Sequence, residues 1–139
     1  MRTVSGLFPK LCDAAHLERA AALTVRGKRG RPDIAWFLFR QEAALATIRA
    51  ALEDGSWRPS GFAIMQVRDP KPRAIARAPV EDRVVHAAVA SLLEPVLLRS
   101  ALPEAFACVQ GGGAHRAVIR LTSLMRRHRF VVHLDVRSF

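Results

Sequence analysis

The stretch KPRAIARAPVEDRVVH, Lys71–His86, decides the fold class that the sequence predicts. Its first half alternates basic and small side chains as an extended strand does, whereas the half that begins at Pro79 repeats its valines with helical spacing. An extended piece over Phe62–Arg68 and a turn over Asp69–Pro72 complete a predicted β-hairpin. The helix is expected to kink or end at Pro95. A hairpin that leads directly into a helix favours an α+β fold.

Further elements are predicted on both sides of this stretch. Asp13 is expected to cap one helix, and Asp33 a longer one that keeps a single apolar stripe until Gly55 ends it. The run Gly111–Gly113 is expected to form a turn before another helix. Phe130–Val136 alternates with apolar residues on nearly both faces, which predicts a central strand.

Composition points to a polyanionic partner. The 139 residues carry a formal charge of +10, from 22 basic residues, 19 of them arginine, against 12 acidic ones. Arginine pairs bidentately with phosphate, so nucleic acid is expected as a partner ahead of a membrane. An arginine-rich composition can also reflect a GC-rich genome, and the charge by itself leaves that alternative open.

Several other classes of protein receive no support. Cys12 and Cys108 are isolated, so neither a zinc knuckle nor a disulfide scaffold is indicated. His86 lies next to the apolar stripe of its helix and is expected in the core rather than as a catalytic residue. No apolar run approaches the roughly 20 residues of a membrane span. The segment Met1–Lys10 lacks a signal-peptide core, so we expect a cytoplasmic protein without membrane partners.

Basic side chains gather in a loop, Arg26–Pro32, and on the extended ribbon that follows the hairpin turn. On the ribbon, alternation predicts one face with Lys71, Arg73, Ile75 and Arg77, and an opposite face with Ala74, Ala76 and Ala78. The groups that we expect to contact phosphates are Lys28, Arg29 and Arg31 in the loop and Lys71, Arg73 and Arg77 on the ribbon. Binding of this kind weakens with salt, with a slope of roughly −0.7 per contact for single strands. The alternative is a solvated edge strand that its charges protect from aggregation.

A single carboxylate, Asp135, lies near the end of the predicted central strand. One interpretation is a structural cap on the next element. The other is a metal ligand, because phosphoryl transfer uses carboxylates that hold two divalent ions. One aspartate cannot do this, so the second interpretation requires partner carboxylates that this sequence does not contain.

Four blocks in order give the chain a family resemblance: RGKRGRPDIAWFLF, PKPRAIARAPVEDRVVHAAVASLLEPVL, ACVQGGGAHRAV and VVHLDVRSF. Together they resemble bacterial reverse transcriptases, most closely those of diversity-generating retroelements. The resemblance implies an N-terminal extension and mostly helical fingers with a β-hairpin over residues 1–128. It implies the first strand of a right-hand polymerase palm over residues 129–139, truncated within the first catalytic motif. Group II intron maturases and retron enzymes share this fold and are weaker alternatives.

The resemblance also implies roles for individual residues. Asp135 matches the first catalytic aspartate of the palm, and the backbone carbonyl of Val136 would complete a Mg²⁺ site. Arg73, with Lys71 as a second contact, matches the grip on the triphosphate of the incoming dNTP. Arg83 and His86 fall in a block that, by this resemblance, forms either the template-side surface or a structural surface of the fingers.

The expected function is therefore the N-terminal part of an RNA-directed DNA polymerase. Its implied partners are an RNA template, a DNA primer, a dNTP and a small accessory protein of the retroelement, with Mg²⁺ as cofactor. The 139 residues alone are expected to be inactive because the later Tyr-x-Asp-Asp motif is absent. The alternative from another class is a non-catalytic basic RNA-binding module.

Overall fold

A computed structural model describes residues 3–68, 70–109 and 111–136 of the chain. The chain separates into two compact units, Met1–Leu98 and Arg99–Phe139, so the predicted fingers segment spans the first unit and most of the second. The predicted α+β class is confirmed, since the described residues form six helices and one two-stranded antiparallel sheet. None of the helices in these described ranges is long and apolar enough to cross a bilayer.

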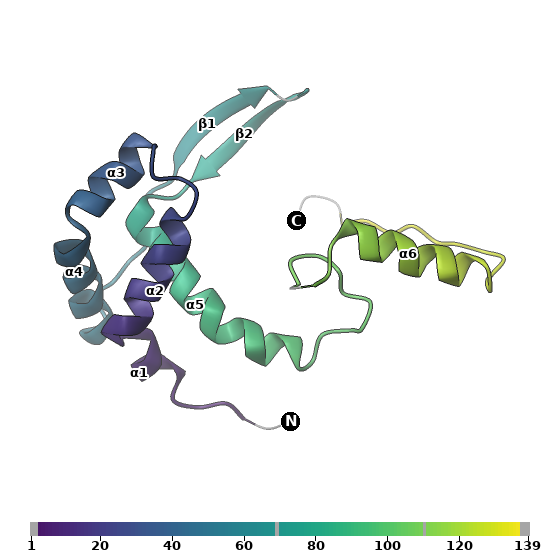
Figure 1. Cartoon of the computed structure of the whole chain (residues 1–139), viewed down its shortest axis with the longest axis horizontal. Helices are drawn as coiled ribbons and strands as arrows, with labels where there is room; N and C mark the ends of the chain where they lie inside the picture. Colours follow the sequence, from purple (N-terminus) through teal and green to yellow (C-terminus); the bar gives the residue numbers. More distant parts are fainter. Residues whose placement is uncertain (1–2, 69, 110, 137–139) are drawn as a thin grey trace. The chain divides into compact units, whose positions relative to one another are not determined.

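The first unit is a small helical body that carries a β-hairpin. Its elements are α1 (Leu7–Leu11), α2 (Ala14–Val25), α3 (Pro32–Phe39), α4 (Gln41–Glu53), β1 (Ala63–Arg68), β2 (Pro72–Arg77) and α5 (Val80–Leu98). α2 lies along α5, and the other helices pack around this pair, while the hairpin projects away from them (Figure 1). Leu17, Ile34, Phe37 and Val84 are the largest fully buried side chains of the core.

The start of α2 follows the sequence prediction. Asp13 caps the helix, because its Oδ1 accepts a hydrogen bond from the backbone N–H of His16 at 2.8 Å. The Nε2 of His16 lies 3.0 Å from the carbonyl oxygen of Ala88 in α5. The N-terminal helix is thus fixed both locally, by its cap, and through a contact 72 residues away in the sequence.

Two predictions for the next segment are wrong. Arg31, not Asp33, is the N-cap of α3, and Pro32 occupies its first turn, so the carboxylate of Asp33 can pair elsewhere. The predicted single helix is also broken at Arg40, whose φ and ψ are −117° and 21°. A straight helix over residues 32–53 would be about 33 Å long. The break allows both α3 and α4 to pack against α5.

The predicted hairpin is confirmed, and Ile75 lies between Arg73 and Arg77 on its basic face as the alternation predicts. In the antiparallel register, Val67 lies opposite Arg73, Met65 opposite Ile75 and Ala63 opposite Arg77. Directly opposed residues project to the same face, so apolar side chains separate the two arginines. Lys71 lies in the bend before β2 rather than on the strand.

α5 begins at Val80 directly after Pro79, and it continues through Pro95 to Leu98, so the proline does not end it. Asp82 in its first turn is buried and accepts hydrogen bonds from Ser60, from the backbone N–H at 2.7 Å and from the hydroxyl at 3.3 Å. This contact ties the chain just before β1 to α5. His86 is exposed rather than in the core.

The second unit contains α6 (Ala114–Met125), preceded by the predicted glycine turn. The backbone N–H groups of Gly112 and Gly113 donate to the carbonyl oxygens of Val109 and Phe106, at 2.8 and 2.7 Å. A Cβ on Gly112 would lie only 2.6 Å from the Phe106 oxygen. Position 112 therefore requires glycine for close backbone approach, and α6 itself buries none of its residues.

The predicted central strand over Phe130–Val136 is wrong in this structure. Residues 130–136 have no regular secondary structure, and Val132 and Leu134 are 78% and 86% exposed. A strand needs a neighbour to pair its backbone N–H and C=O groups. Within the described ranges the only strands are β1 and β2, and they pair with each other. Residues 137–139, the last of the expected palm segment, lie outside the described part of the chain.

Candidate nucleic-acid interface

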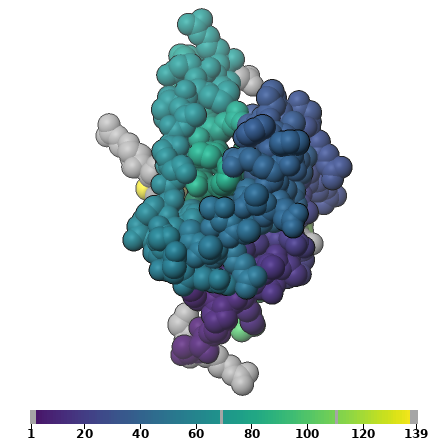
Figure 2. All heavy atoms as spheres, turned by 90° about the vertical axis from the view of Figure 1, so that its left-hand side faces the viewer, coloured from purple at the N-terminus to yellow at the C-terminus, as the bar shows by residue number. Residues whose placement is uncertain are grey.

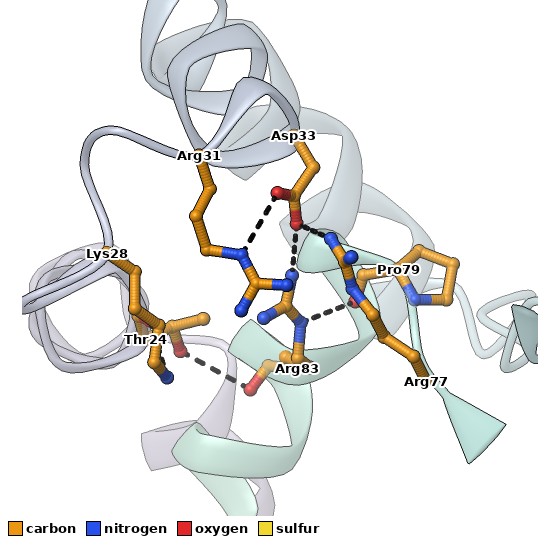
Figure 3. Close-up of polar contacts among 7 residues, drawn as sticks. All are labelled: Thr24, Lys28, Arg31, Asp33, Arg77, Pro79 and Arg83. Atoms are coloured by element: carbon orange, nitrogen blue, oxygen red, sulfur yellow. Dashed lines mark hydrogen bonds and ion pairs between the residues drawn. The ribbon is translucent and has the colours of Figure 1, made fainter. Parts of the chain in front are cut away.

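Three arginines converge on one carboxylate at the base of the hairpin (Figure 3). Asp33 Oδ2 accepts from Nη2 of Arg83 at 2.8 Å and from Nη2 of Arg77, while its Oδ1 lies 3.7 Å from Nε of Arg31. These arginines come from the loop before α3, the end of β2 and the first turn of α5. We call these four residues the arginine cluster, and its formal charge is +2.

The arginine cluster also sets the charge state of its carboxylate. Partial burial raises the pKa of Asp33, but the hydrogen bonds from Arg77 and Arg83 and the positive charges of Arg77 and Arg31 outweigh it, so the pKa lies below its usual value. Asp33 is thus ionised at neutral pH. The arginine side chains remain 22–46% exposed, which leaves guanidinium edges within reach of a phosphate.

The sequence-predicted binding residues fall into two groups. Arg31, Arg77 and Arg83 belong to the arginine cluster. In the loop nearby, Arg29 is exposed, and Lys28 donates through Nζ to the carbonyl oxygen of Thr24 at 3.4 Å.

Lys71 and Arg73 form the second group, near the tip of the hairpin. Both are exposed, and neither pairs with a carboxylate of the described residues. The ribbon's charges are therefore not equivalent, because its basal arginine is held in an ion pair while these two side chains extend into solvent. Their contact with phosphate stays a prediction.

A cleft of about 380 Å³ lies beside the arginine cluster. Asp33 and Arg77 line one part of it, and Trp36, Arg40 and Glu81 line another. Figure 2 shows this region between the hairpin, in teal, and the α3–α4 segment, in blue. Arg40, the N-cap of α4, forms an ion pair with Glu81 of α5, and this contact connects the two helices at the cleft wall. The cleft is lined by two arginines, two carboxylates and a tryptophan, and the net positive charge beside it comes from Arg31 and Arg83 of the arginine cluster.

Sequence reasoning missed Asp33 and Trp36 as parts of this site. The stripe of α3 that packs inward was readable from the sequence, and Trp36 lies off it, which was an available sign of a surface role. Asp33 pairs with Arg77 and Arg83, which follow it by 44 and 50 residues, and nothing near Asp33 in the sequence indicates this pairing.

The described residues do not by themselves fit a magnesium site. Asp135 is exposed in a segment without regular structure, in the second unit, and no group of three His, Cys, Asp or Glu side chains in the described ranges could hold a metal ion. Two-metal phosphoryl transfer needs several carboxylates around two Mg²⁺ ions, and Asp135 with the carbonyl of Val136 supplies only one carboxylate.

No model of a known protein family matches the chain, and neither does any curated protein.

Proposed function

We propose that this chain is the RNA-binding fingers region of an RNA-directed DNA polymerase. The observation that carries the proposal is a hairpin fixed at its base by the arginine cluster, with Arg73 exposed near its tip. A reverse transcriptase needs such an arrangement, because a cation must be held over the nucleotide-binding site while the strand that carries it stays in place. The resemblance of the four sequence blocks to reverse transcriptases and the geometry of the hairpin both support this proposal.

The two-part character of the hairpin supports this proposal. Arg77 is held by Asp33 and stabilises the base, whereas Arg73 has no carboxylate partner among the described residues. A guanidinium that none of the described carboxylates holds can contact a triphosphate or an RNA phosphate without first breaking an ion pair with them.

The second unit is proposed to contribute the start of the palm. Its apolar side chains remain exposed, including Val118 and Met125 of α6 at 59% and 54%, and Phe130 at 87%. Exposed apolar side chains in this number indicate a surface that other structure covers. In the proposed polymerase, further palm strands cover it and provide carboxylates beside Asp135.

A non-catalytic RNA-binding module is the second candidate. The arginine cluster, the cleft and the hairpin all lie in the first unit, and none of them involves Asp135. RNA binding is therefore common to both candidates, and only catalysis separates them.

Equilibrium binding measurements test the RNA binding that both candidates share. We expect the chain to bind a fluorescent single-stranded RNA with an affinity that falls steeply with KCl, and Arg73→Ala to reduce the slope by about 0.7. Arg58→Ala is the matched control, because Arg58 is exposed and its guanidinium already donates to the carbonyl oxygens of Gly55 and Trp57. Binding without salt dependence, or equal slopes for Arg73→Ala and the wild type, would contradict the proposal.

Catalysis is tested on the complete reading frame. The coding sequence after the Phe139 codon is expected to continue and to encode a Tyr-x-Asp-Asp motif. The full-length product should extend a DNA primer on an RNA template, and Asp135→Asn should abolish extension while RNA binding persists. If RNA binds but no such frame exists, the result supports the RNA-binding module or a decayed polymerase gene and contradicts catalysis.

A further inference from the structure

Two large aromatic side chains of α3 are stacked on each other and exposed. The ring centroids of Trp36 and Phe39 are 5.9 Å apart with an interplanar angle of 22°. Trp36 is 60% exposed and Phe39 is 83% exposed. The same short helix buries Ile34 and Phe37 almost completely, so the aromatic pair is not needed to complete the core.

A cation accompanies the aromatic pair. The guanidinium carbon of Arg40 lies 5.8 Å from the centroid of the Trp36 ring, within the range of cation–π attraction. Arg40 is also ion-paired with Glu81 of α5, which restricts its orientation. Contact with Arg40 therefore restricts the Trp36 ring, and less conformational entropy is lost when a ligand stacks on it.

Trp36 of the aromatic pair lies next to the arginine cluster, whereas Phe39 lines a different cleft, beside α2 and α4. Trp36 and Arg40 line the same cleft as Asp33 and Arg77. Aromatic platforms beside positive charge are the usual means of binding single-stranded nucleic acid, because bases stack on the rings while cations follow the backbone. A purely apolar partner would leave the arginines around the cleft unexplained, and a purely acidic partner would leave the exposed aromatic rings unexplained.

We propose that Trp36 and Phe39 form a platform on which an unpaired base of single-stranded RNA stacks. The phosphates that flank this base lie against Arg31, Arg77 and Arg83. This inference rests on the proposed RNA binding and adds to it a base contact outside the hairpin. Stacking tolerates any base, so little sequence preference is expected at this position.

Tryptophan fluorescence tests the platform directly. The chain has two tryptophans, so Trp57→Phe leaves Trp36 as the sole reporter. The probes are a 12-nucleotide oligouridylate and an abasic strand of the same length and charge. We expect both strands to bind and only the oligouridylate to quench Trp36. Equal quenching by both strands, or binding of oligouridylate without quenching, would overturn the inference.

Affinity measurements provide a second test that does not depend on Trp57→Phe folding well. Phe39→Ala should weaken oligouridylate binding by about 5- to 150-fold, because stacking contributes this much per base, and should leave the salt slope unchanged. Affinity for the abasic strand should not change. Phe8→Ala is the matched control, since Phe8 is an exposed phenylalanine on α1, at 55%.

The outcomes separate this inference from the proposed function. If both strands bind with a normal salt slope but Phe39→Ala has no effect, the platform is refuted and RNA binding stands. If neither strand binds, the proposed function fails and the platform with it. If Trp36 emission changes with protein concentration in the absence of RNA, the aromatic pair is a contact between copies of the chain, which refutes the platform.

Discussion

The ion pairs of Asp33 allow a quantitative prediction about what holds the hairpin in place. Asp33→Asn keeps the shape of the side chain but removes the charge that pairs with Arg77 and Arg83. Hydrogen bonds to charged groups contribute about 1.5–3 kcal/mol, and exposed ion pairs only about 0.2–1 kcal/mol. The Asp33 side chain is 28% exposed, so we place the loss at about 2 kcal/mol, towards the middle of these ranges.

Urea denaturation followed by tryptophan fluorescence measures this loss, since Trp36 and Trp57 both lie in the first unit. With an m-value of about 1–3 kcal/mol per molar, the midpoint should fall by about 1 M. The matched control is Glu53→Gln, which makes the same charge change in an exposed i,i+4 pair with Arg49. That control should cost less than about 0.5 kcal/mol.

The pH dependence provides an internal check. Because the folded-state pKa of Asp33 lies below its usual value, its stabilisation is present above the unfolded-state pKa and is lost as pH falls through the folded one. The difference between wild type and Asp33→Asn should therefore be constant from pH 7 to 5 and shrink below about pH 4. A loss at pH 7 no larger than that of Glu53→Gln would refute the assigned role.

Three further outcomes are expected. Asp33→Asn should strengthen RNA binding and steepen its salt slope by up to about 1.4, because two guanidiniums are released, and fluorescence anisotropy across a KCl series measures this. Gly112→Ala should speed hydrogen exchange of the Gly113 amide, because the added Cβ would lie 2.6 Å from the Phe106 oxygen that accepts from this amide. The control Gly30→Ala, whose added Cβ has no atom within 4 Å, should leave this exchange rate unchanged. Leu17→Ala, at a site 1% exposed, should cost about 2–5 kcal/mol in urea denaturation, and Leu23→Ala, at 57% exposed, less than about 0.5 kcal/mol.

The sequence by itself determined the elements whose stability is local. Asp13 caps α2, the hairpin forms over two extended pieces around a proline-containing turn, and α5 begins after Pro79. In each case the deciding interactions lie within a few residues. Caps, turn chemistry and hydrophobic period express themselves over that range, so they can be recognised without knowing the fold.

Two predictions that depended on residues far away in the sequence were wrong. Asp33 was expected to be a cap, but carboxylates take the strongest available partners, and the fold brings Arg77 and Arg83 to it. The alternation in Phe130–Val136 is a genuine strand pattern, yet a strand exists only where another strand pairs with it.

The sequence likewise predicted only part of the candidate site. Sequence alone selected the basic loop and the ribbon, because charge and alternation are visible in one dimension. Only the tertiary structure decided that Arg77 is ion-paired while Arg73 has no carboxylate partner within the described ranges, and that Trp36 and Arg40 line the same cleft as Asp33 and Arg77. The physical reason is that ion pairing, burial and stacking depend on distances of a few ångströms between residues far apart in the chain, and folding alone fixes those distances.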